Sequence, residues 1–186
     1  MKDDKINHIV TIFGSSKPNS GEEDYQIAYQ LGKKLAEEGY TICNGGYAGT
    51  MEASARGARD GGGKTIGVIT EHFNRSANDY ILETVRVKTL TDRLLKLIEL
   101  GDAYIVLKGS TGTLVELSMA WEFMNKSVIK EKPIIVYRDF WKPVIGTLTT
   151  ELIHEGLENV TKFIRYANNA DDCINILNSS LNRCNI

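Results

Sequence analysis

Cysteine is scarce in this sequence, and its distribution is irregular. The 186 residues contain Cys43, Cys173 and Cys184, with no C-x-x-C pair. An odd number of widely spaced cysteines argues against both a disulfide framework and a structural zinc site. The three histidines are equally far apart and form no H-E-x-x-H, so no metal site is expected. We interpret the cysteines as small buried side chains of a protein in a reducing cytosol.

Long apolar runs and a strong charge bias are missing as well. No apolar run approaches the roughly 20 residues that a bilayer-spanning helix needs. The first residues, MKDDKINH, are polar and lack the apolar core of a signal peptide. The net charge of −2 gives no general attraction to nucleic acid or to anionic membranes. We therefore expect a cytoplasmic protein that binds neither nucleic acid nor membrane.

Short apolar runs rich in β-branched residues alternate with helical patterns along the whole chain. The expected strands cover 8–13, 40–43, 64–70, 84–88, 103–107, 132–137 and 161–167, and the expected helices cover 20–39, 49–61, 91–100, 113–125, 143–156 and 171–177. No Pro/Ser linker, composition break or repeat divides the sequence. This alternation predicts a single α/β domain over 1–186, Rossmann-like and doubly wound, with a mostly parallel sheet flanked by helices.

Folds of this kind bind ligands beyond the carboxyl ends of their strands, near the point where the strand order reverses. Three of the expected strands lead through turns rich in Gly, Ser and Thr to the start of a helix. Glycine lets the backbone approach a ligand closely, and helix N-termini offer unpaired N–H groups to anions. The expected phosphate-binding residues are Gly14, Ser15, Gly45, Gly46, Gly49, Thr50, Gly109, Ser110, Thr111, Gly112 and Thr113.

Two common phosphate-binding motifs do not occur. The sequence has no G-x-x-x-x-G-K-[ST], which argues against a P-loop NTPase. It has no G-x-G-x-x-G after the first strand, and Asn44 ends the second strand where a ribose-binding carboxylate is expected. A standard NAD-dependent dehydrogenase is therefore disfavoured.

Two charged residues near the third turn each allow two interpretations. Glu116 is either the capping-box partner of Thr113, in the S/T-x-x-E spacing that Ser20 and Glu23 also show, or a carboxylate beside a bound phosphate. Arg93 is either a solvated or ion-paired helix residue beside Asp92, or a cation that faces the same site. Spacing alone leaves both choices open.

The stretch Lys108-Gly-Ser-Thr-Gly-Thr-Leu-Val-Glu116 resembles P-G-G-x-G-T-x-x-E. That motif is the hallmark of the LOG family, the cytokinin riboside 5′-monophosphate phosphoribohydrolases, often labelled lysine-decarboxylase-like. The Gly-Thr pair and the final Glu are intact. Lys108 and Ser110 stand where the family has Pro and Gly.

Other segments strengthen this resemblance. VTIFGSS at 10–16 and GGYAGTMEA at 45–53 are similar to the family's two earlier glycine-rich segments. Arg93 matches the arginine that the family carries in a helix shortly before the strand leading to the hallmark motif. The similarity extends over about residues 8–137, in the family's order.

The resemblance implies an enzyme that needs no cofactor and hydrolyses the N-glycosidic bond of a nucleoside 5′-monophosphate. Glu116 and Arg93 are its implied catalytic residues. Glu116 would stabilise the oxocarbenium ion or take a proton from water, while Arg93 orients Glu116 or grips the substrate. No residue stands out as the acid that protonates the leaving base. The base itself is not indicated, although Tyr47, Met51 and the 71–84 connection are expected to line its pocket.

Two other functions remain open, and one expectation concerns assembly. The chain is alternatively a non-catalytic nucleotide-binding module, or a nucleoside deoxyribosyltransferase-like enzyme that traps a sugar on its carboxylate. Members of the LOG family are commonly homodimers. The predicted helix 113–125, with Trp121, Phe123 and Met124, has more apolar surface than one core stripe needs, so it is the expected interface. For Trp121 and Met124, core packing or a helix–helix contact is the preferred interpretation.

Overall fold

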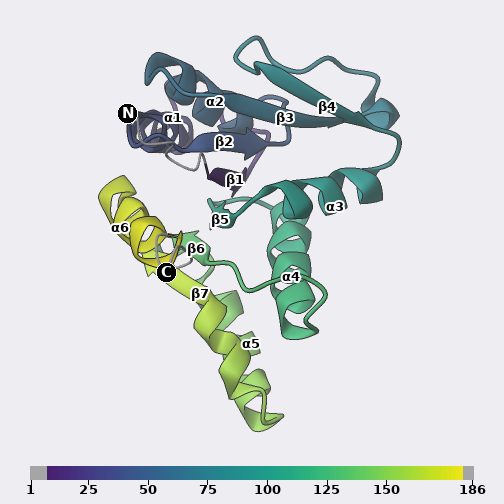
Figure 1. Ribbon diagram of the computed structural model, residues 1–186, viewed down its shortest axis with the longest axis vertical. Helices are drawn as coiled ribbons and strands as arrows, with labels where there is room; N and C mark the ends of the chain where they lie inside the picture. Colours follow the sequence, from purple (N-terminus) through teal and green to yellow (C-terminus); the bar gives the residue numbers. More distant parts are fainter. Residues whose placement is uncertain (1–7, 182–186) are drawn as a thin grey trace, which may run out of the picture.

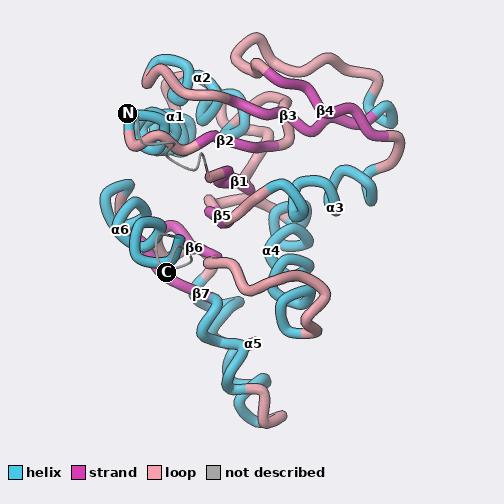
Figure 2. Tube along the Cα trace, in the orientation of Figure 1, coloured by secondary structure: helices cyan, strands magenta, loops and turns pink. Residues whose placement is uncertain are grey.

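A parallel sheet of seven strands forms the centre of the protein (Figures 1 and 2). The computed structural model describes residues 8–181, so Cys184 and the first seven residues lie outside the described part. The strands are β1 (Ile9–Phe13), β2 (Thr41–Asn44), β3 (Thr65–Thr70), β4 (Glu83–Val87), β5 (Ala103–Val106), β6 (Ile134–Tyr137) and β7 (Ile164–Ala167). All pair in parallel, in the order β4-β3-β2-β1-β5-β6-β7. This confirms the predicted Rossmann-like α/β fold.

Helices cover both faces of this sheet (Figure 1). They are α1 (Glu23–Glu37), α2 (Thr50–Asp60), α3 (Leu90–Leu100), α4 (Thr111–Asn125), α5 (Lys142–His154) and α6 (Ala170–Leu181), with short 3₁₀ helices η1 (Glu71–Phe73) and η2 (Glu158–Phe163). Within residues 8–181, no helix is long and apolar enough to cross a membrane.

The sheet has a hydrophobic core on each face, and most strands contribute to both, because successive side chains point to opposite faces. Val10 and Ile12 of β1 pack with α1, α2 and α6 on one face. Phe13 and its stacked neighbour Tyr104 pack with α3, α4 and α5 on the other. Cys43 is fully buried in the second core, as expected of a small hydrophobe, and burial raises the pKa of its thiol to about 12.

The strand order reverses between β1 and β5. The chain runs outward from β1 through β2 and β3 to β4, and then returns to place β5 on the free side of β1. The turns that follow β1, β2 and β5 therefore meet at one edge. The Thr50 N–H donates to the Ser15 carbonyl at 2.8 Å, and the Leu107 N–H donates to the Phe13 carbonyl at 2.9 Å. This is where a doubly wound fold binds its ligand.

Several element boundaries differ from the sequence expectation. The predicted capping box of Ser20 and Glu23 is wrong, because α1 starts at Glu23 and its N-cap, Glu22, makes no side-chain capping bond. The last helix is longer than predicted, with 12 residues instead of one or two turns. The last strand is shorter, because Val160 and Phe163 enter the core from η2.

The large apolar side chains of helix α4 pack mainly in the protein's own hydrophobic core. Trp121 is 5% exposed and Met124 is 4% exposed, which agrees with core packing. The Trp121 Nε1–H donates to the carbonyl of Val160 at 2.9 Å, and Phe123 is half-buried against the same core. The homodimer therefore remains a prediction. Trp121, Phe123 and Met124 no longer support it, because they pack inside the protein's own core.

Candidate active site

A cavity of about 630 Å³ lies at the carboxyl edge of the sheet. One side is polar and belongs to the ends of β1 and β5, with Gly14, Ser15, Ser110, Gly112 and Thr113 among its residues. The opposite side follows β2 and β3. Glu116 and Arg93 both line the space between the two sides. The structure therefore brings the two implied catalytic residues and part of the predicted phosphate-binding set to one cavity.

The N-terminus of α4 forms the polar side. The first α-helical hydrogen bond runs from the Leu114 N–H to the Ser110 carbonyl at 3.0 Å, so the N–H groups of residues 111–113 precede it. Such N–H groups, with the positive end of the helix dipole, bind anions. Ser110 has an extended backbone with φ −108°, so a serine in place of the family's glycine costs no backbone strain there. A Cβ at Gly112 would have no neighbour within 4 Å beyond its own stretch of helix, and Gly112 lines the cavity.

Other predicted phosphate-binding residues frame the cavity without lining it. The Thr50 hydroxyl donates to the Ser15 carbonyl at 3.0 Å and closes the β1 turn onto α2. Gly49 has φ +73°, and a Cβ at that position would lie 2.3 Å from the Ser15 carbonyl oxygen. A Cβ at Gly109 would lie 2.2 Å from the Thr113 hydroxyl oxygen. Thr111, the first residue of α4, also lies outside the lining. A direct phosphate contact by these residues stays a prediction.

Asn44 organises the turn after β2. Its amide nitrogen donates to the Met51 carbonyl at 2.8 Å, and its amide oxygen accepts from the Gly46 N–H at 2.8 Å. Asn44 is fully buried, so it holds the Gly45–Gly46 turn in shape and is not exposed to a ligand. This explains why an amide stands where a dinucleotide-binding fold would carry a ribose-binding carboxylate.

Arg93 is a half-buried residue of the site, and its interpretation as a surface residue paired with Asp92 is wrong. Its Nε donates to the Val68 carbonyl at 2.8 Å and its Nη2 to the Gly45 carbonyl at 3.0 Å. The guanidinium carbon lies 5.4 Å from the ring centroid of Tyr47. Asp92 instead completes a capping box with Thr89 at the start of α3. Burial lowers the pKa of Arg93, and the charge of Glu116 opposes this shift.

Glu116 does not take part in a capping box. Helix α4 begins at Thr111 after Ser110, so Thr113 is already inside the helix and Glu116 lies in the second turn. Burial raises the pKa of the Glu116 carboxyl to about 7, and Arg93 partly offsets this rise. Among the described residues no ion pair within 4 Å joins the two groups. Arg93 therefore acts on Glu116 through its field and not as a direct partner.

Aromatic and basic residues form the side of the cavity near β3. Tyr47 and Met51 line it as expected, and the 71–84 connection contributes His72, Phe73 and Arg75. The Phe73 ring stands edge-on to the Tyr47 ring, 5.5 Å between centroids. Sequence reasoning missed these three as individual residues because the connection has no periodicity. The sequence feature that could have identified them is their position directly after β3, at the carboxyl edge where such folds bind ligands.

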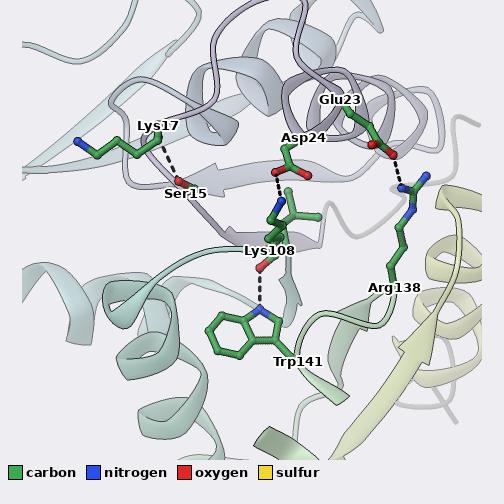
Figure 3. Close-up of polar contacts among 8 residues, drawn as sticks. Ser15, Lys17, Glu23, Asp24, Lys108, Arg138 and Trp141 are labelled. Carbon is green, nitrogen blue, oxygen red and sulfur yellow. Dashed lines mark hydrogen bonds and ion pairs between the residues drawn. The ribbon is translucent and has the colours of Figure 1, made fainter. Parts of the chain in front are cut away.

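Lys108, the most unusual residue of the hallmark motif, does not line this cavity. Figure 3 shows its ammonium directed at Asp24 of α1, at 2.9 Å. Beside it, Arg138 pairs with Glu23 at 2.7 Å. The Trp141 Nε1–H donates to the carbonyl of residue 107 at 2.9 Å. Lys108 thus secures the β5 turn against α1 and supplies no charge to the polar side of the cavity.

Taken together, the parallel doubly wound sheet, the helix N-terminus at its carboxyl edge and the half-buried carboxylate beside it define a Rossmann-like protein with a candidate ligand site at that edge. The chain matches the SLOG cluster4 family over residues 7–174 and belongs to that family. This confirms the resemblance to the LOG family inferred from the KGSTGTLVE stretch.

The chain is also similar to individual proteins of known sequence or structure. A cytokinin riboside 5′-monophosphate phosphoribohydrolase of Rhodococcoides fascians is 30% identical over 145 residues, which cover 74% of this chain and 72% of that protein. An uncharacterized protein of Archaeoglobus fulgidus is 34% identical over 115 residues, or 62% and 75% of the two chains. The solved structure of the molybdenum cofactor binding protein from Rippkaea orientalis has a TM-score of 0.73 at 25% identity, over 93% of this chain and 96% of that chain.

Proposed function

We propose that the protein is a nucleoside 5′-monophosphate phosphoribohydrolase. It adds water to C1′ of the ribose, breaks the N-glycosidic bond, and releases free base and ribose 5-phosphate. The observation that carries this proposal is the position of Glu116. It follows Gly112 by four residues, about 6 Å along the helix axis at 1.5 Å per residue. A phosphate at the α4 N-terminus would then leave the ribose within reach of the carboxylate.

The chemistry of the reaction fits the two charged residues. Cleavage develops positive charge on the ribose, and a carboxylate close to C1′ stabilises that charge and accepts a proton from the attacking water. A general base works best with a pKa near the operating pH, and the Glu116 carboxyl has a pKa of about 7. Arg93 favours the ionised form of Glu116 and holds the Gly45 turn through its bond to that carbonyl.

The direct test is product release. Purified protein is incubated with AMP, GMP, CMP, UMP and their N6- or N4-substituted derivatives, and free base is separated by chromatography. We expect base and ribose 5-phosphate from a monophosphate and slower release from the matching unphosphorylated riboside. Glu116→Gln should reduce the rate at least about a hundredfold, the lower end of general-base contributions. Equal rates on nucleotide and riboside would remove the phosphate site from the proposal.

A second candidate is a carrier that binds a phosphate-bearing ligand without turnover. The similarity to a molybdenum cofactor binding protein and the change of Pro-Gly-Gly to Lys-Gly-Ser favour it. Saturable nucleotide binding by calorimetry without any base release would support this candidate. A deoxyribosyltransferase-like activity would instead appear as exchange of labelled base without net hydrolysis.

A further inference from the structure

Hydrolysis of an N-glycosidic bond needs a catalytic acid as well as a catalytic base. The departing nucleobase carries away the electron pair of the broken bond and must take up a proton. The lining of the cavity limits the choice of acid. Arg75 and Arg93 keep their protons at any working pH. The Tyr47 hydroxyl already donates to the Thr70 carbonyl at 3.3 Å and accepts from the Thr70 N–H at 2.9 Å. Glu116 is assigned to the attacking water.

The expected place of the base follows from the two sides of the cavity. With the phosphate at α4 and C1′ beside Glu116, the base extends away from β5 toward β3. Strands are spaced about 4.8 Å apart, which puts β3 roughly 10 Å from β1, on the far side of the cavity. Tyr47 and Phe73 offer aromatic surfaces there, to which a flat base can bind by stacking.

His72 lies on this side of the cavity and is held there by its backbone. It belongs to η1, directly after β3, and its N–H donates to the Thr70 hydroxyl at 3.2 Å. Its ring is 5.4 Å from the Phe73 ring, centroid to centroid. In the described part of the chain, no hydrogen bond involves the imidazole nitrogens. The ring is therefore positioned at the base end with its nitrogens available to a ligand.

From this geometry we infer that His72 is the acid that protonates the leaving base, an assignment that rests on the proposed hydrolase function. Imidazole can donate a proton from a ring nitrogen and is the side chain most often used for acid–base catalysis in enzymes. As the C1′–N bond breaks, its electron pair passes into the base, and a base nitrogen takes the proton from the His72 imidazolium. Water adds its oxygen to C1′ and gives its proton to Glu116. Solvent then returns that proton to His72.

A comparison of two leaving groups tests this role. One substrate is the nucleoside 5′-monophosphate that the protein cleaves fastest, and the other is p-nitrophenyl β-D-ribofuranoside 5-phosphate, whose nitrophenolate leaves without a proton. His72→Gln should lower kcat on the nucleotide at least about a hundredfold and leave kcat on the nitrophenyl substrate within about twofold. Glu116→Gln should lower both rates, because both reactions need the attacking water.

The control is His154→Gln, the same substitution at an exposed position on α5, and it should alter neither rate. If His72→Gln slows both substrates equally, or slows neither, His72 is not the acid, although the hydrolase function stands. If the unmodified protein cleaves neither substrate, the hydrolase function fails, and the acid assignment fails with it.

Discussion

Arg93 and Gly45 lie so close together that no side chain fits between them. The Arg93 Nη2 donates to the Gly45 carbonyl at 3.0 Å, and a Cβ at Gly45 would lie 1.5 Å from that nitrogen. The absence of a side chain at Gly45 therefore leaves room for the Arg93 guanidinium, in addition to any contact of Gly45 with phosphate. It links the turn after β2 to α3, two segments that are 48 residues apart in sequence.

Replacing this glycine should displace the arginine. We expect Gly45→Ala to push the Arg93 guanidinium away from the Gly45 and Val68 carbonyls, lowering both activity and stability. Losing hydrogen bonds that a charged group makes with buried carbonyls costs on the order of 1.5–3 kcal/mol each. Gly146→Ala is the matched control, because nothing lies within 4 Å of a Cβ at that exposed helix position. Thermal unfolding and steady-state rates measure both effects, and equal results for the two variants would contradict the expectation.

A side chain at Gly112 should leave the fold intact but weaken nucleotide binding. A Cβ at this position has no neighbour within 4 Å beyond its own stretch of helix, and Gly112 lines the cavity beside the α4 N-terminus. We expect Gly112→Val to fold normally and to lower nucleotide affinity at least about tenfold, which corresponds to roughly 1.4 kcal/mol of binding free energy. Calorimetric titration with the best monophosphate measures this, with Gly146→Val as the control. Unchanged affinity in the folded variant would rule out phosphate binding at the α4 N-terminus.

The pKa of Glu116 predicts how the rate depends on pH. Because the reactive form is the carboxylate, kcat on the nitrophenyl substrate should rise with pH through about 7, the value to which burial raises the pKa of this carboxyl. That substrate is the suitable one because its departure needs no proton from His72, which lines the same cavity. Arg93 and Arg75 face the same cavity and stay charged throughout this range. A pH–rate profile from 5 to 9 checks the rise. A rate that falls through pH 7 would show that Glu116 acts in its protonated form.

The raised pKa of Glu116 also predicts that the free energy of unfolding falls as pH rises, whereas the rate increases. Glu116 holds its proton up to about pH 7 in the folded chain but releases it near 4.5 in the unfolded chain. Between these values the folded state binds more protons, so the free energy of unfolding falls as pH rises. Glutamine cannot ionise, so Glu116→Gln should match the parent near pH 4.5 and exceed it above pH 7, by on the order of 1–3 kcal/mol. Denaturant unfolding at both pH values tests this, and a Gln variant less stable at pH 8 would contradict it.

Lys108 should matter little for nucleotide binding. Its ammonium pairs with Asp24 and not with the cavity, and exposed pairs of this kind contribute little to stability. We expect Lys108→Ala to leave nucleotide affinity and its salt dependence unchanged and to reduce stability only slightly. Titrations at two salt concentrations distinguish the alternatives. A large, salt-sensitive loss of affinity would mean that Lys108 turns toward the phosphate when ligand binds.

The homodimer can be tested at the exposed residues of α4 and α5. Val115 is 48% exposed and Leu148 is 41% exposed, on helices that belong to the same core. We propose that these side chains meet a second copy. Val115→Glu or Leu148→Glu should then shift the sedimentation coefficient from dimer to monomer, whereas Leu82→Glu on the β4 side should not. A parent chain that sediments as a monomer would end this proposal.

The sequence predicted the fold well because strand and helix periods differ clearly. The patterns around residues 103–107 and 113–125, for example, agree with β5 and α4 to within two residues. The capping box predicted for Ser20 and Glu23 was wrong, and the one left open for Thr113 and Glu116 does not form, for the same physical reason. The S/T-x-x-E spacing predicts a cap only when the helix starts at the Ser or Thr, and α4 starts two residues earlier, at Thr111.

The contacts of the site were harder to predict than its location. Arg93 bonds to the Val68 and Gly45 carbonyls, which are 25 and 48 residues away, and no local pattern encodes such a contact. Lys108 stands where the LOG family has Pro, and its partner Asp24 is on α1, 84 positions earlier in the sequence. These pairings depend on how the helices pack on the sheet, which a local sequence pattern does not specify.

Within residues 8–181, the cavity is lined only by residues from Gly14 to Glu116, while β6, α5, β7 and α6 contribute none. The later segment builds the far edge of the sheet and carries exposed apolar side chains such as Leu148. Substitutions in the later segment can therefore reshape that edge without changing a residue of the cavity. Descendants of a common ancestor can diverge at this edge while keeping the same cavity, or change the cavity while keeping the edge.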